Sequence, residues 1–268
     1  LPNLRASIAK AMGVSLPGTK VKPDAGLPPN GYLLRLDEIP FDSGQVGPDQ
    51  ENPLPYLVGR LENLLLKHLP TFLGFQEVED LLRDWGKTED GAALIRSALP
   101  DRPSRLRFVS LLRALVAERV PLTHWQTILA VLQKQPLTAE NFAAVLREDR
   151  LQLKDQLPGN RPDQVRLPLP PDLEARLQSG IQHQGYTSFL AFPTREIQEL
   201  FTLIRQTVAS AASVAALVTR DPDLRPLLQP LVSMEFPDLM ILAQEEVISG
   251  PEPSRSAGPA ETTPPEGA

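Results

Sequence analysis

Residues 104–116 read SRLRFVSLLRALV, and their apolar positions decide the fold class. Phe108, Leu111, Leu112, Leu115 and Val116 recur three or four residues apart, which is the spacing of one helix face. Ser104 precedes them and is predicted to cap the helix. Hydrophobic residues make up 41% of the chain and aromatic residues only 5%, so the core must be built mainly from aliphatic side chains. The stretch predicts a helix-rich protein.

The same helical spacing extends over residues 54–150 on both sides of that stretch. Residues 57–69 and 78–85 each carry leucine and valine on one face and predict two more helices. The predicted helix boundaries farther along are Gly86 as a C-terminal stop, Thr123 with Gln126 as a capping box, and Thr138 as an N-terminal cap. Because the connections are short, we expect residues 54–150 to form a bundle of mostly antiparallel helices.

The residues before the bundle, 1–53, predict a small mixed α/β piece. A helix is expected over residues 4–12, ended by Gly13, and a strand over residues 32–36. Val21 is expected in a further strand. Residues 41–53 contain Gly, Pro, Asp and Asn and are expected to form a loop.

The residues after the bundle, 151–249, alternate between short apolar runs and amphipathic stretches. This alternation is typical of an α/β layer domain. Strands are expected over 165–169, 188–192, 214–218 and 239–242, and helices over 172–181, 194–209 and 222–234, the last capped by Asp221. Residues 250–268 have no apolar spacing, and we expect a disordered tail. The expected fold is therefore α+β and helix-rich.

Composition excludes several classes of function. The chain has 27 Lys and Arg against 33 Asp and Glu, a net charge of −6, which argues against nucleic-acid binding. It has no cysteine, so disulfides and thiolate metal sites are excluded, and a cytoplasmic location is favoured. No apolar run approaches the roughly 20 residues that span a bilayer, so no membrane insertion by this segment is expected. Since the chain begins with Leu1 rather than Met, we expect it to be a piece of a longer protein or a processed product.

No motif with enzymatic chemistry is found. Gly86-Lys87-Thr88 ends like a phosphate-binding loop, but Leu81 occupies the position where that motif needs glycine. The three histidines lie on separate predicted elements, without acidic partners at ligand spacing. The acidic residues Glu77, Asp80 and Asp84 share a helix face; this is more typical of a solvated face than of a cation site or a hydrolase. We therefore expect no catalytic residue, no cofactor and no metal.

Five residues are predicted to contact a protein partner. Trp85, His124 and Trp125 are candidates because exposed aromatic residues often anchor partners. The alternative is that the two tryptophans fill gaps between helices. Arg105 and Arg113 belong to an Arg-rich stretch from Arg102 to Arg119, which could face an acidic neighbour. Replacing both with glutamate is then expected to weaken self-association without altering the fold. The alternative is the solvated face of an amphipathic helix.

Several motifs together resemble one known family. Residues 72–82, FLGFQEVEDLL, and residues 111–122, LLRALVAERVPL, followed by Thr127-Ile-Leu129, are similar to segments of the FHIPEP family of flagellar and type III secretion export gates. Weaker similarities follow in the same order along residues 1–248, at Leu4-Arg5, Gly13, Leu16-Pro17, Leu169–Glu174, Arg225, Pro237, Leu239 and Glu245-Glu246. The order makes the combination more specific than any single motif.

The resemblance implies a non-enzymatic protein–protein interaction domain. Such a domain lies in the cytoplasm, docks export substrates, chaperones or other components of the export apparatus, and assembles as a homo-oligomeric ring. Thr123-His124 departs from the family's usual Arg-Asp, and between Gln45 and Tyr56 only about ten residues stand where the family carries a whole subdomain. The alternative is therefore a soluble adaptor or regulator of secretion that retains the fold but not the gate role.

Overall fold

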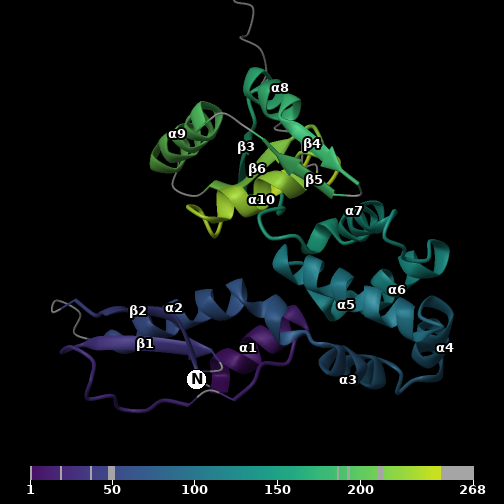
Figure 1. Ribbon diagram of the computed structural model, residues 1–268, viewed down its shortest axis with the longest axis horizontal. Helices are drawn as coiled ribbons and strands as arrows, with labels where there is room; N and C mark the ends of the chain where they lie inside the picture. Colours follow the sequence, from purple (N-terminus) through teal and green to yellow (C-terminus); the bar gives the residue numbers. More distant parts are fainter. Residues whose placement is uncertain are drawn as a thin grey trace, which may run out of the picture. The chain divides into compact units, whose positions relative to one another are not determined.

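The computed structural model describes residues 2–18, 20–36, 38–47, 52–185, 187–191, 194–210 and 214–248 (Figure 1). Two compact units account for the chain. The first unit contains residues 1–158 and 181–191, and the second contains residues 159–180 and 192–268. A separation of residues 1–53 from 54–150 stays a prediction, since both stretches belong to the first unit. The predicted tail over 250–268 lies outside the described residues.

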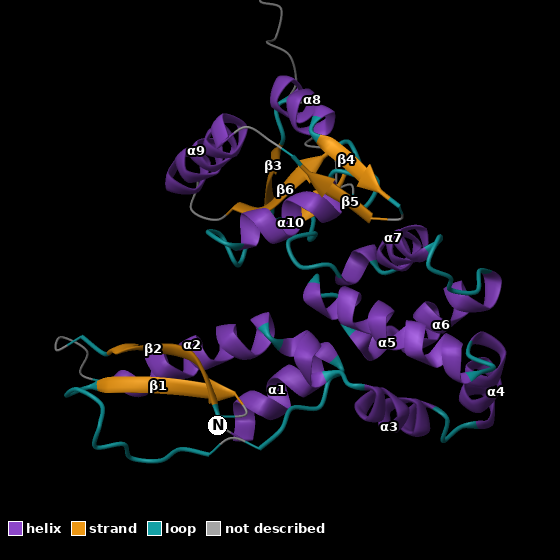
Figure 2. Cartoon of the chain, in the orientation of Figure 1, coloured by secondary structure: helices purple, strands orange, loops and turns teal. Residues whose placement is uncertain are grey.

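The first unit is mostly helical (Figure 2). Its helices are α1 (Pro2–Met12), α2 (Pro53–Lys67), α3 (Phe75–Trp85), α4 (Glu89–Ala98), α5 (Arg102–Ala117), α6 (Trp125–Lys134) and α7 (Phe142–Gln152), with the 3-10 turns η1 (Leu69–Phe72), η2 (Leu122–His124) and η3 (Lys154–Gln156). The expected helix at 104–116 is confirmed as α5, and its predicted apolar face is buried. Helix α5 packs on α3, α7 and η1, while α6 packs on α4 and α7.

Three predicted helix caps in this unit are wrong. Asp101 caps α5 and Ser104 stands three residues later, where the two complete a capping box. Helix α6 begins at Trp125 after the η2 turn, with no side-chain cap from Thr123. Thr138 forms a reciprocal pair of hydrogen bonds with Asn141, and α7 begins only after that loop. Helix α5 thus begins before its predicted cap, whereas a 3-10 turn delays α6 and a loop closed by side chains delays α7.

Helix α4 is absent from the sequence-based expectations. Its apolar residues are interrupted by Gly91 and by two consecutive alanines, which weakens the helical spacing. Thr88 caps it by accepting a hydrogen bond from the Gly91 amide at 3.2 Å. The Gly86-Lys87-Thr88 sequence is thus the junction between α3, which ends at Gly86 as predicted, and α4.

The N-terminal residues form α1 and an antiparallel pair, β1 (Gly31–Leu36) and β2 (Ile39–Gln45). The predicted loop over 41–53 is wrong in its first part, because Phe41 lies within β2 and Asp42 to Gln45 pair with β1 despite their turn-like composition. The predicted strand at Val21 is also wrong, since that residue lies in an irregular segment with its side chain 79% exposed. Asp42 connects this hairpin to α2 through a bidentate ion pair with Arg60.

A second hairpin, β4 (Ile181–Gln184) and β5 (Thr187–Leu190), groups with the first unit. Only its second strand corresponds to an expected one, over 188–192. The expected helix over 172–181 stops at Ser179, and Gly180 ends it. Ile181 then starts β4 rather than continuing the helix.

The second unit is a layered α/β structure, as predicted. Its elements are β3 (Val165–Pro168), α8 (Pro171–Ser179), α9 (Thr194–Ser210), β6 (Val214–Thr219), α10 (Arg225–Ser233) and β7 (Met240–Ala243). The strands form a parallel sheet in the order β3-β6-β7, α10 packs on β7, and α8 packs on α9. The predicted start of α10 at Pro222 under an Asp221 cap is wrong, because Asp221 instead accepts from the Asp223 amide in a tight turn.

Candidate protein-docking surface

Trp85 and Trp125 lie against each other in the first unit. Their rings are stacked with centroids 5.2 Å apart and an interplanar angle of 2°. Trp85 also meets the ring of the fully buried Phe108 edge-on at 6.4 Å. Both tryptophans are half-buried, so they fill the space between α3, α5 and α6 and still present part of their surface. Stacked aromatic pairs of this kind add about 1 kcal/mol beyond burial.

A glycine makes the tryptophan stack possible. A Cβ atom on Gly91 would clash with the Trp85 carbonyl oxygen and lie 3.1 Å from the ring of Trp125. Helix α4 therefore approaches the stack more closely than a residue with a side chain would permit. This close approach explains why the sequence places a helix-weakening residue in the first turn of α4.

His124 stands beside the stack at the start of α6. Its side chain is exposed, and it occupies the N-cap position of α6 without capping it. The other two histidines lie elsewhere. His68 ends α2 and meets Phe41 edge-on at 4.4 Å, where burial lowers its pKa and Lys67 adds to the effect. His183 shares a hydrogen bond with Ser188 across the second hairpin.

Arg105 and Arg113 bond within the first unit rather than projecting into solvent. Arg105 forms an ion pair with Glu79 of α3 at 2.8 Å, with side chains 34% and 24% exposed. Arg113 donates from Nε to the Leu73 carbonyl oxygen at 2.6 Å. Both side chains fasten α5 to the segment that precedes it, so reversal of their charge is expected to destabilise the fold.

The acidic residues of α3 are engaged with neighbouring cations. Asp80 pairs with Arg83 at 2.7 Å, and Asp84 pairs with Lys87 at 2.8 Å, which lowers the pKa of the Asp84 carboxyl. Within the described part of the chain, no group of three or more acidic or histidine side chains is arranged to hold a metal ion. The arrangement fits a solvated helix face.

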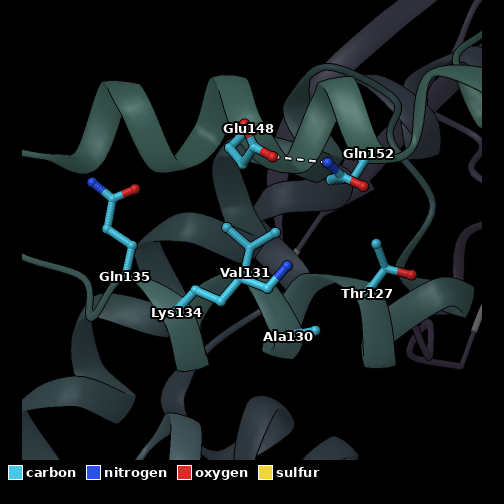
Figure 3. A pocket seen from close by; sticks show the side chains of 7 residues that line it. All are labelled: Thr127, Ala130, Val131, Lys134, Gln135, Glu148 and Gln152. Atoms are coloured by element: carbon cyan, nitrogen blue, oxygen red, sulfur yellow. Dashed lines mark hydrogen bonds between the residues drawn. The ribbon is translucent and has the colours of Figure 1, made fainter.

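A pocket that sequence reasoning missed lies between α6 and α7 (Figure 3). Its volume is about 230 Å³, and its lining is Thr127, Ala130, Val131, Lys134, Gln135, Glu148 and Gln152. Glu148 accepts a hydrogen bond from Gln152 at 2.8 Å along the α7 side. The spacing of Thr127, Ala130 and Lys134 on one side of α6 could have indicated a shared face, but nothing in the sequence indicates that α7 leaves a gap there. We call this feature the α6–α7 pocket.

Asp149 lies on the same helix, α7, and is fully buried. Neither of its carboxyl oxygens has a hydrogen-bond partner among the described residues. Burial, with a smaller effect of Glu148, raises the pKa of Asp149 to about 8. The next residue, Arg150, is equally buried but pairs with Glu118 at 2.8 Å. An acidic residue within a helical stretch gives no sequence signal that distinguishes this environment from a solvated one.

Glu174 and Glu246, two buried acidic residues of the second unit, both accept hydrogen bonds. Glu174 of α8 accepts hydrogen bonds from the Thr219 hydroxyl and from the Arg220 and Asp221 amides, at the carboxyl end of β6. It borders an open hollow of about 430 Å³ that Arg220 and Gln178 also line. Glu246 accepts from the Ala243 amide at 2.8 Å after β7. These contacts fix the carboxyl edge of the parallel sheet.

The model of the FHIPEP family matches residues 51–251. The chain belongs to the FHIPEP family. The family predicted from the sequence motifs is thus confirmed, including the helical and α/β parts that carry those motifs.

Among relatives of this FHIPEP member, the flagellar biosynthesis protein FlhA of Caulobacter vibrioides is 26% identical over 242 residues. The alignment takes in 87% of this chain and 34% of FlhA, so the chain spans about a third of the length of that relative. In the described part of the chain, the helices are all too short or too polar to cross a membrane.

Solved structures share the fold of this FHIPEP chain at low identity. A chain of the Chlamydia pneumoniae CdsV and CdsO protein complex matches with a TM-score of 0.74 and 19% identity, over 92% of this chain and 86% of that one. The nonameric EscV cytosolic domain from the type III secretion system matches with a TM-score of 0.69 and 16% identity, over 92% and 87%. These identities show the fold alone.

Proposed function

We propose that this chain is a non-enzymatic docking domain of a flagellar or type III secretion export gate, acting in the cytoplasm. The observation that carries the proposal is the family match over residues 51–251. The relative FlhA is a flagellar biosynthesis protein, and the similar EscV domain is a cytosolic part of a type III secretion system. Export substrates, chaperones and other export components are the partners that this role requires.

We propose the exposed edge of the Trp85–Trp125 stack, together with His124, as one docking surface. Half-buried aromatic rings on a rigid helical support are suited to anchor a partner, because little side-chain entropy is lost on binding. Arg105 and Arg113 contribute indirectly by holding α3 and the end of η1 on α5. His124 is the residue to test, since it is exposed and caps no helix.

The test is binding of the chain to chaperone–substrate complexes from its own secretion system, measured by titration calorimetry. Replacing His124 with glutamate should weaken binding about tenfold, the typical loss at an anchor residue. Replacing the exposed Arg96 of α4 with glutamate is the matched control and should leave affinity unchanged. Equal affinities for both variants would exclude this surface, and no binding by the unmodified chain would count against the docking role itself.

We further propose assembly as a homo-oligomeric ring, as the nonameric EscV domain does. The chain's charge is unevenly divided: the first unit carries 19 basic and 19 acidic residues, and the second carries 8 basic and 14 acidic residues, a net −6. In a head-to-tail contact, the acidic second unit of one copy would meet the exposed Arg102 and Arg107 of α5 in the next copy. Repulsion between like units should keep dilute chains monomeric.

Sedimentation velocity tests this assembly. Chains should be monomers when dilute and associate when concentrated or tethered to vesicles by an added N-terminal tag. Replacing the exposed Arg107 with glutamate should weaken association, whereas the same change at the exposed Lys87 should not. Strict monomers under every condition would exclude the ring and favour a soluble adaptor.

A further inference from the structure

The buried side of α7 contains two ionisable residues, of which one has an ion-pair partner and the other has no hydrogen bond to its side chain. Val145, Leu146, Asp149 and Arg150 are all buried there. Arg150 has its charge matched by Glu118 at the end of α5. Asp149 has no hydrogen bond to either oxygen within the described structure. An ionised carboxylate in such a position would cost several kcal/mol, so the neutral form is strongly favoured.

The charged groups on and around α7 leave this conclusion unchanged. Helices α5 and α6 pack against α7, and η3 follows it. Of the charged residues on these elements, Glu118 pairs with Arg150, and Lys134 of α6 lines the pocket together with Glu148. Helix α7 itself adds Arg147, and η3 adds Lys154 and Asp155. None of them donates a hydrogen bond to Asp149. Glu148 is a like charge, which disfavours ionisation further.

We propose that Asp149 is a proton-dependent switch: its neutral carboxyl lets α7 seat on α5 and α6, and its ionisation loosens α7 and with it the α6–α7 pocket. An ionised carboxylate can recover its hydration only if α7 moves away from the two helices that cover it. Such a movement changes the α6–α7 pocket directly, because Glu148 and Gln152 of α7 form one wall of it (Figure 3). The proposal concerns the fold itself and does not depend on the export role.

The direction of the pH effect follows from the two states. In the unfolded chain the carboxyl ionises near its ordinary pKa of about 4, and in the folded chain it ionises near 8. Between these values unfolding releases a proton, so stability is greatest at the acidic end and falls as pH rises. Above about pH 8 Asp149 is ionised in both the folded and the unfolded chain, so its titration no longer changes the stability.

The first test compares the full chain with Asp149→Asn in denaturant unfolding across pH. The unfolding constant of the unmodified chain, divided by that of Asp149→Asn, should rise about tenfold per pH unit between roughly pH 5 and pH 8, and then level off. Other titrating groups cancel in this ratio. The control Asp155→Asn removes an exposed carboxyl of η3 and should give a nearly constant ratio. A constant ratio for Asp149→Asn as well would overturn the proposal.

A second measurement works on the folded protein and does not require the asparagine variant to fold. Infrared spectroscopy near neutral pH should show a band of one protonated buried carboxyl, which disappears through about pH 8. Because the chain has no cysteine, spin labels at Thr127→Cys and Gln152→Cys report on the α6–α7 pocket alone. Their distance distribution should broaden as that band disappears. Absence of the band, or an unchanged distribution while it disappears, would overturn the switch.

Discussion

Helix α7 of the first unit and the carboxyl edge of the sheet in the second unit bury acidic residues in opposite ways. Asp149 is fully buried and has no hydrogen bond to its carboxyl group among the described residues. Glu174 is 6% exposed and accepts three hydrogen bonds, two of them from backbone amides. Similar burial therefore leaves one carboxyl group without a hydrogen-bond partner and gives the other three donors.

The difference arises from where each fold leaves unpaired backbone donors. A helix interior uses its amides in its own hydrogen bonds, so an acidic side chain packed between helices finds no backbone donor. A parallel strand ends in a loop whose amides point outward at the carboxyl edge of the sheet. Glu174 reaches such amides at Arg220 and Asp221, immediately after β6. The secondary structure around a buried acidic residue thus decides whether backbone donors reach its carboxyl group.

The largest expected effect is loss of the carboxylate at the sheet edge. Replacing Glu174 with leucine removes the acceptor that the buried Thr219 hydroxyl shares with two half-buried backbone amides, which should cost about 4 kcal/mol in urea unfolding. The control makes the same replacement at Glu199, whose ion pair with Arg176 is nearly half exposed. This change should cost less than about 1 kcal/mol. Similar costs for the two changes would mean that the hydrogen bonds of Glu174 do not stabilise the sheet edge more than an exposed ion pair does.

The next effect concerns the buried cation beside Asp149. Replacing Arg150 with methionine removes the partner of Glu118 in a site where Arg150 is fully buried, and should cost about 3 kcal/mol. Replacing Arg83 with methionine breaks an ion pair of similar length, 2.7 Å, that is exposed, and should change stability by less than about 1 kcal/mol. If both variants unfold at the same denaturant concentration, burial does not distinguish these pairs.

The sequence predicted most of the helices and strands that surround the two buried acidic residues, but not the difference between those residues. The leucine spacing of α5 and the stop at Gly86 were sufficient because helix periodicity and glycine caps act locally. Helix α4 was missed because Gly91 and its alanines dilute the apolar pattern, although that glycine is what admits the tryptophan stack. Asp149 was not predicted, since whether a helical acidic residue meets water or another helix depends on packing with segments distant in sequence.

A smaller effect tests the hydroxyl that serves Glu174. Replacing Thr219 with valine keeps the shape of the side chain but removes one of the three donors, and should cost about 1.5 kcal/mol. The two backbone amides remain as donors, so the loss should be smaller than that of Glu174→Leu. Thermal unfolding should therefore show a melting temperature between those of the unmodified chain and Glu174→Leu. A melting temperature as low as that of Glu174→Leu would show that the hydroxyl carries the whole effect of Glu174.

The smallest effect asks whether Asp149 can be given a partner. Val145 is fully buried one turn before Asp149 on the same helix face, so a threonine there places a hydroxyl within reach of the carboxyl. A buried hydroxyl without a partner usually destabilises a core, and Val116→Thr in α5 measures that cost at another fully buried position.

We expect Val145→Thr to cost about 1 kcal/mol less than Val116→Thr, because the new hydroxyl and Asp149 satisfy each other. Denaturant unfolding of both variants, repeated in the Asp149→Leu background, isolates the interaction as a double-mutant cycle. The advantage of Val145→Thr should vanish when Asp149 is leucine, since an apolar side chain offers the hydroxyl nothing. If Val145→Thr still costs less than Val116→Thr in the Asp149→Leu background, the difference reflects looser packing around α7. The lack of a hydrogen-bond donor would then not be what distinguishes Asp149 from Glu174.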